Sequence, residues 1–186
     1  MLYVKKYNWS ARCLMLYNLP INKLNHTDLN MYQCGTEDCE PGHSYGPAVR
    51  DHFLIHYIHS GKGTFCVGDM VYRLEAGQGL LICPGVVTFY KADSDNPWSY
   101  SWVGFHGLKA ELYLKHGGLN VHNPVFTDDD SNFIGGCFRQ MIATSRLEKS
   151  RELRLTGILY LFLSHLIENN GKDRFTDNAT DRKELY

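Results

Sequence analysis

Short apolar segments separated by turn-forming residues recur through the first two thirds of the chain. Several of them alternate between apolar and polar residues, which is typical of strands with one buried face. The candidate strands are residues 28–35, 53–59, 63–67, 70–74 and 79–83, a strand from about Val87, and residues 98–105. Residues 60–63 and Gly68-Asp69 have the composition of hairpin turns, so we expect the strands they join to form an antiparallel meander.

The pattern changes after Leu108, where apolar residues recur at helical spacing. Helices are expected over 109–116, 131–146 and 151–169, the first ending at Gly117-Gly118. Short strands followed by helices predict a mainly β fold, a jelly-roll or cupin barrel with a C-terminal helical hairpin. The expected divisions are an N-terminal arm (1–28), a barrel (29–107), a helical region (108–169) and a polar linker (170–186).

Strand 98–105 has an unusual inward face. Its alternation places Trp98, Tyr100 and Trp102 on one side, with serines and apolar residues on the other. Aromatic rings with polar tips can stack on a ligand and also hydrogen-bond to its hydroxyl groups. These rings could therefore line a ligand cavity, or they could simply fill the barrel.

A set of motifs, in order along the chain, resembles the N-terminal ligand-binding domain of AraC-family transcriptional regulators. The motifs are Arg50-x-x-Phe-x-x-His-Tyr-x-x-x-Gly-x-Gly, Gly77-x-Gly-x-Leu-Ile-x-Pro-Gly, Tyr90-x-Ala-Asp and Pro97-Trp-x-Tyr-x-Trp-Val-x-Phe-x-Gly. The resemblance implies a cupin-like barrel that binds an effector, usually a sugar, and a separate helix-turn-helix domain that reads DNA.

We expect the effector site on the inner wall and on an irregular loop over residues 39–51. The candidate ligand-binding residues are His43, Tyr45, Arg50, His56, Thr88, Tyr90, Tyr100 and Trp102. Arg50 could alternatively form a salt bridge at the barrel edge. In the resembled family the N-terminal segment can close over the ligand; here Trp9 could do so or pack on the outside.

The charge balance argues against DNA binding by these residues, because 19 Lys and Arg oppose 20 Asp and Glu, without the basic excess of nucleic-acid binders. The resemblance implies that the polar segment 170–186 leads into a helix-turn-helix domain. We therefore expect the chain to be part of a longer regulator that contacts DNA only through that domain.

The sequence does not predict a metal or another cofactor in the barrel. Alignment with the ligand positions of metal-binding cupins places Pro47, Val49, Leu54 and Thr88 there, and none of them is a strong transition-metal ligand. His56 is expected to point inward as a wall residue. An enzyme of the cupin fold that modifies sugars is the alternative class, and it would require metal ligands or a convincing acid and base.

Helix 151–169 is apolar around most of its circumference. A helix that packs against a single partner needs a narrower apolar stripe, so the excess indicates a second partner. The resembled family uses such a helix for dimerisation. The stripe expected at a homodimer seam comprises Leu155, Leu159, Phe162 and Leu166. Complete burial between the barrel and the preceding helix is the other interpretation.

The six cysteines form no Cys-x-x-Cys pair, and a bridge between Cys34 and Cys39 is not expected in a chain without an export signal. The apolar run 13–17 near the start is too short for a signal peptide or a membrane span. These features favour a cytoplasmic protein with reduced thiols and no membrane contact.

Overall fold

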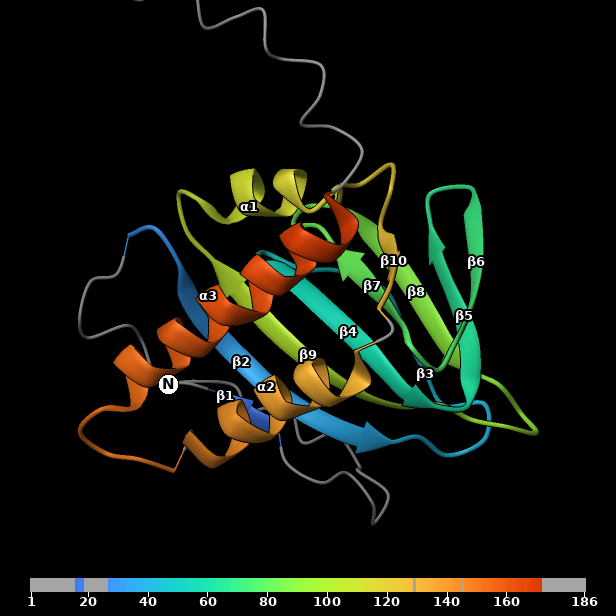
Figure 1. The fold of residues 1–186 in the computed structure, drawn as a ribbon. Helices are drawn as coiled ribbons and strands as arrows, with labels where there is room; N and C mark the ends of the chain where they lie inside the picture. Colours follow the sequence, from blue (N-terminus) through green and yellow to red (C-terminus); the bar gives the residue numbers. More distant parts are fainter. Residues whose placement is uncertain (1–15, 19–26, 129, 145, 172–186) are drawn as a thin grey trace, which may run out of the picture.

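The computed structural model describes residues 16–18, 27–128, 130–144 and 146–171. Its strands form two antiparallel sheets (Figure 1). The larger sheet has the order β1 (Leu16–Asn18), β2 (Asn30–Asp38), β9 (Ser99–His106), β4 (Phe53–Ser60), β7 (Gln78–Ile82) and β10 (Val125–Thr127). The smaller sheet has the order β3 (Ser44–Val49), β8 (Val87–Ala92), β5 (Lys62–Val67) and β6 (Met70–Glu75).

Two apolar cores lie on opposite sides of the larger sheet. Alternation along β9 separates them, because Tyr100 and Trp102 belong to the core between the sheets, whereas Val103 and Phe105 belong to the core under the helices. The predicted facing of this strand is therefore confirmed. The arrangement is a cupin-type barrel with a helical layer on one outer face.

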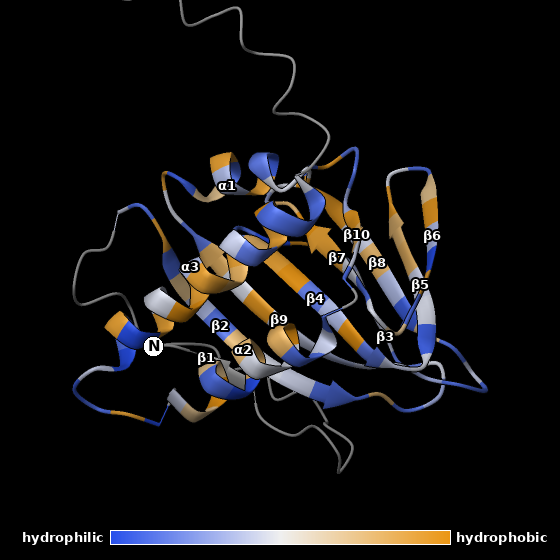
Figure 2. Ribbon diagram, in the orientation of Figure 1, coloured by the Kyte–Doolittle hydropathy of each residue, from blue (hydrophilic) through white to orange (hydrophobic). Residues whose placement is uncertain are grey.

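Helices α1 (Ala110–His116), α2 (Ser131–Thr144) and α3 (Arg151–Asn170) follow the barrel strands, as the periodicity predicted. Figure 1 shows α2 and α3 running across the outer face of the larger sheet. Figure 2 shows hydrophobic and hydrophilic segments alternating along α3, and its buried residues belong to the core against that sheet. No helix among the described residues is long and apolar enough to cross a membrane.

A buried carboxylate fixes α3 to the sheet. Asp128 follows β10, and its side chain is fully buried 2.8 Å from His165 Nε2 on α3. Asn169 Nδ2 donates to the same carboxylate at 3.2 Å, and the Tyr57 hydroxyl of β4 donates to the Asp128 carbonyl at 3.3 Å. The region 108–169 is thus not purely helical, because β10 within it completes the larger sheet.

The loop expected over residues 39–51 is wrong in part, since it contains strand β3, paired with β8. The register shifts between Tyr45 and Ala48, where Gly46 and Pro47 intervene. Gly46 has a φ of 104°, and Pro47 has no N–H to donate. Gly46 and Pro47 indicate a loop in the sequence, but β3 tolerates them because they lie where its pairing with β8 is irregular.

The predicted hairpin between strands 53–59 and 63–67 is also wrong. β4 lies in the larger sheet and β5 in the smaller one, so Gly61 carries the chain from one sheet to the other. Gly61 has a φ of 71°, and an added Cβ would lie 2.2 Å from the Pro97 carbonyl oxygen. Gly61, which suggested a hairpin, is therefore required by a crossing between sheets. The other predicted hairpin, between β5 and β6 at Gly68-Asp69, does form.

The stripe expected at the dimer seam is instead core of the same protomer. Leu155, Leu159, Phe162 and Leu166 are each at most 2 % exposed. They pack against the larger sheet and α2 as part of the outer core. The prediction that these four side chains form the dimer seam is therefore wrong. They are not available to a second copy, because the single protomer already buries them.

Candidate functional site

The inner wall of the barrel is a group of four contacting rings from three strands. His56 of β4 lies 4.7 Å from Tyr100 of β9 and 5.0 Å from Tyr90 of β8, measured between ring centroids. Trp102 completes the group, 6.3 Å from His56. Each ring is at most 6 % exposed. The structure thus brings together the four wall residues that the sequence assigned to a ligand site.

Strand β3, which was predicted as a loop, forms the rim of this wall together with Arg50. Tyr45 of β3 stacks on Tyr90, with ring centroids 5.6 Å apart. The Arg50 guanidinium carbon lies 4.5 Å from the centre of the Tyr45 ring, a cation–π contact. Thr88 is buried and shares the inward face of β8 with Tyr90. Among the described residues, Arg50 forms no ion pair with a carboxylate.

The tight fit of Trp98 depends on a glycine opposite it. A Cβ added to Gly63 would lie 2.3 Å from the Trp98 ring, so β5 has room for this indole only without a side chain. The indole N–H of Trp98 is buried without a hydrogen-bond partner among the described residues. The wall therefore contains a polar group that a ligand or a nearby acceptor could satisfy.

Glu37 is a wall residue that the sequence pattern did not reveal. Its carboxylate accepts a hydrogen bond of 3.2 Å from the Tyr100 hydroxyl, and it lies 3.7 Å from His43 Nε2. The predicted first strand ended at residue 35, whereas β2 continues to Asp38. Extending the alternation from Gln33 through Gly35 would have placed Glu37 on the inward face.

Burial keeps the aromatic wall uncharged. Burial, helped by the nearby Arg50 charge, lowers the pKa of His56 from 6.5 to about 3. Burial also raises the pKa values of Tyr90 and Tyr100 above the ordinary 10.0 of tyrosine. At neutral pH these three side chains are therefore neutral groups that can donate or accept hydrogen bonds.

The depressed pKa of His56 predicts acid sensitivity. Below about pH 6.5 the unfolded chain takes up a proton at this residue that the folded chain excludes, so the free energy of unfolding falls as the pH decreases. The expected contribution is a loss of about 2 kcal/mol between pH 7 and pH 5. In urea unfolding, the free energy of unfolding of the native protein should fall between pH 7 and pH 5 by about 2 kcal/mol more than that of His56→Asn.

The exposed His122→Gln variant is the matched control for this acid effect, and it should keep the native pH dependence. An identical pH dependence of the native protein and His56→Asn would contradict the burial of a neutral histidine in the wall.

Burial also governs the thiols. The described cysteines, which are Cys34, Cys39, Cys66, Cys83 and Cys137, are free. Burial and then the Glu37 charge raise the pKa of Cys39 from 9.0 to about 12, while the neighbouring side chains of Tyr100 and Trp98 act in the lowering direction. Cys39 is therefore a buried thiol beside a carboxylate and two hydrogen-bond donors.

The metal set of metal-binding cupins does not fit this barrel. Leu54 and Thr88, at two of the aligned ligand positions, are buried side chains without a strong metal donor. His59 faces outward and lies 2.7 Å from Ser101 Oγ, and His52 lies between Asp51 and Gln33, at 2.6 and 2.9 Å. Of His52, His56 and His59, only His56 points into the aromatic wall, as the strand alternation predicted.

These features define a cupin-type barrel with an aromatic inner wall of neutral, polar-tipped groups. The model of the AraC-like ligand binding domain matches residues 30–163, and the chain therefore belongs to the AraC-like ligand-binding domain family. The resemblance seen in the sequence motifs is thus confirmed.

Three relatives are regulators of operons. The Msm operon regulatory protein of Streptococcus mutans is 37% identical over 150 residues, which cover 78% of this chain and 52% of that protein. The raffinose operon transcriptional regulatory protein RafR of Pediococcus pentosaceus is 42% identical over 46% of this chain and 32% of its own length. The lactose operon transcription activator of Staphylococcus xylosus is 36% identical over 73% of this chain and 48% of its own. The chain thus spans about half the length of the first of these relatives.

Proposed function

We propose that this chain is the effector-sensing domain of a transcription regulator and that it binds a neutral sugar on the inner wall of the barrel. The observation that carries the proposal is the contact group of His56, Tyr90, Tyr100 and Trp102, four buried rings whose polar atoms are uncharged. The relatives that regulate raffinose and lactose operons support this ligand class.

The wall has the chemistry that sugar recognition requires. The faces of Trp102 and Tyr100 can stack on the C–H face of a sugar ring, while the imidazole, phenols and Thr88 hydroxyl can exchange hydrogen bonds with its hydroxyl groups. Arg50, Tyr45 and His43 at the rim add further donors. Glu37 can accept from sugar hydroxyls but disfavours an anionic ligand, because like charges at close range repel.

Calorimetry with a panel of sugars tests this function. We expect raffinose, lactose or a related neutral sugar to bind saturably and to be recovered unchanged, since we assign no catalytic role to the wall. Sugar phosphates and sugar acids of the same size should bind more weakly. Tight binding of an anionic metabolite or a lipid, with no binding of neutral sugars, would overturn the proposal.

We place DNA reading outside these residues, in another part of the whole protein. The chain has nearly equal numbers of basic and acidic residues, and its matches cover only 52%, 32% and 48% of the lengths of the three relatives. The effector would then act by changing how two sensing domains present their reading heads to two DNA half-sites.

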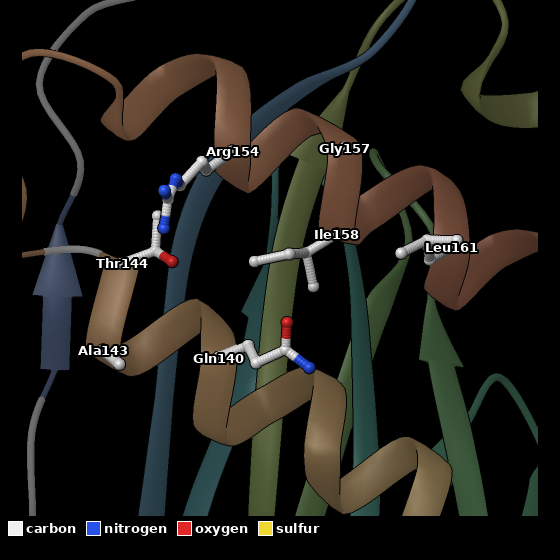
Figure 3. Close-up of a pocket in the computed structure, with 7 residues that line it drawn as sticks. All are labelled: Gln140, Ala143, Thr144, Arg154, Gly157, Ile158 and Leu161. Atoms are coloured by element: carbon white, nitrogen blue, oxygen red, sulfur yellow. The ribbon is translucent and has the colours of Figure 1, made fainter.

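The homodimer seam is proposed on the exposed face of α3, opposite the stripe that the protomer buries. Leu153 and Leu161 are 64% and 57% exposed, and Gly157 lies between them at the same helical face. Beside this face, a groove of about 440 Å³ lies between α2 and α3 (Figure 3). The groove is lined by Gln140, Ala143, Thr144, Arg154, Gly157, Ile158 and Leu161.

We place a second copy on this face, because a two-fold axis would bring the exposed leucines of each protomer against the groove of the other. Replacing Leu153 and Leu161 by serine should give a folded monomer, since neither side chain contributes to the protomer core. Sedimentation of the native protein and the double variant measures the change. A native protein that is monomeric at tens of micromolar, or a double variant that stays dimeric, would contradict the seam.

A further inference from the structure

A second constellation of side chains lies at the end of β2, where the sequence pattern predicted no metal site. Glu37, Cys39 and His43 each present one donor atom, and the three atoms lie within 4.8 Å of one another. His43 Nε2 and Glu37 Oε1 are 3.7 Å apart. The donors are a nitrogen, a sulfur and an oxygen, so the group combines the three ligand types that zinc accepts in proteins.

The backbone holds these residues in place on both sides of the turn. The Cys39 N–H donates to the Trp98 carbonyl at 3.2 Å, which continues the pairing of β2 with β9. The His43 N–H donates to the Glu40 carbonyl at 3.0 Å, and the His43 carbonyl accepts from Ala92 N–H at 2.8 Å. The turn over residues 40–43 thus returns the imidazole to the end of β2, next to Glu37.

We propose that Glu37, Cys39 and His43 bind one zinc-class divalent ion at the barrel rim. Zinc–ligand distances of about 2.0–2.3 Å in a tetrahedron separate neighbouring ligand atoms by about 3.3–3.8 Å. The observed 3.7 Å between nitrogen and oxygen meets this requirement, and the sulfur lies within 4.8 Å of both atoms, so it needs an approach of at most about 1–1.5 Å. Three protein ligands leave one coordination position for water or a bound molecule, and the side chain of His43, 35% exposed, leaves the ion accessible from solvent.

The surroundings supply an outer shell for such an ion. The Tyr100 hydroxyl donates to Glu37 Oε2 at 3.2 Å and would orient that carboxylate. Trp98 lies beside Cys39, and its buried indole N–H has no hydrogen-bond partner among the described residues. Cys39 already lies beside this N–H, and a metal-bound thiolate would be a stronger acceptor for it than the neutral thiol.

This site differs from the metal site of metal-binding cupins, whose aligned positions here are Pro47, Val49, Leu54 and Thr88. It shares Glu37 and His43 with the proposed sugar site, but metal binding requires no sugar and is tested without one. The expectation that the chain carries no metal rested on those aligned positions, which do not include Glu37, Cys39 or His43.

The test is a titration of chelator-treated protein with Co²⁺ and then Zn²⁺, without sugar. We expect one equivalent of Co²⁺ to bind and to give the near-ultraviolet absorption of a thiolate–cobalt bond, and Zn²⁺ to displace it. Cys39→Ser should abolish that absorption. Glu37→Gln and His43→Gln should each weaken zinc binding more than about tenfold. Altering a residue that only supports a ligand already costs about tenfold, so loss of a ligand itself should cost more.

Matched controls separate this site from general thiol or imidazole binding. Cys66→Ser removes a half-buried thiol on β5, and His122→Gln removes an exposed imidazole; both should bind cobalt and zinc like the native protein. His43 is only partly buried, so His43→Gln keeps the test informative if Cys39→Ser fails to fold. Absence of saturable binding, or cobalt–thiolate absorption that survives in Cys39→Ser, would overturn the proposal.

Discussion

Trp102→Leu is expected to weaken sugar binding about 30-fold while the protein remains folded. The indole lies in the inner wall, 5.8 Å from the Tyr100 ring and 6.3 Å from the His56 ring, between centroids. Removing an aromatic group at the centre of a buried contact costs about 2 kcal/mol of binding free energy, which corresponds to roughly 30-fold in Kd. Calorimetry with the tightest sugar of the panel measures this change.

Phe53→Leu is the matched control for the loss of an aromatic ring. Phe53 lies on the same sheet but packs on its other side, stacked against Phe105 at 6.0 Å. Both variants should lose some stability in urea, because each replaces a packed ring by a smaller side chain. Only Trp102→Leu should lose affinity. Equal affinities of the native protein and Trp102→Leu would place the sugar away from the inner wall.

Phe162→Ala is expected to lower the free energy of unfolding by about 3–5 kcal/mol. The side chain is fully buried between α3 and α2, with its ring 5.5 Å from that of Phe138. Since whole domains are stable by only about 5–15 kcal/mol, this single truncation should remove a large part of the total. Urea unfolding at low protein concentration measures the effect on the protomer.

The neighbouring Leu161→Ala is the control for this prediction. Leu161 is 57% exposed, so the protomer should lose no more than about 0.5 kcal/mol. The pair distinguishes core from seam, because Phe162→Ala should unfold more easily and Leu161→Ala should dimerise less. A small stability loss in Phe162→Ala, together with weaker dimerisation, would instead place the buried stripe at the seam.

Local pattern was sufficient for most of the fold. The alternation of residues along β9 is enough to separate the inner face of Trp98, Tyr100 and Trp102 from the outer face. Helical spacing similarly identified α2 and α3. These features depend on side-chain period and turn composition, which are encoded over a few neighbouring residues.

The errors share a dependence on contacts distant in sequence. Gly61 permits a tight turn equally in a hairpin and in a crossing between sheets, and pairing of β4 with β9 and β7 determines which one forms. The apolar excess of α3 could not show which face meets the protomer core. Glu37 was missed because the predicted strand ended at residue 35, whereas pairing with β9 extends β2 to Asp38. Its Tyr100 and His43 partners agree with the inward position that the longer alternation gives.

The position of the bound sugar tests the central claim most directly. The chain has three tryptophans, so an NMR spectrum of ¹⁵N-labelled protein contains three indole N–H signals, which single replacements by Phe can assign. We predict that saturating neutral sugar shifts the Trp98 and Trp102 signals in proportion to the calorimetric occupancy. Binding that leaves both signals unchanged would contradict recognition on the inner wall of the barrel.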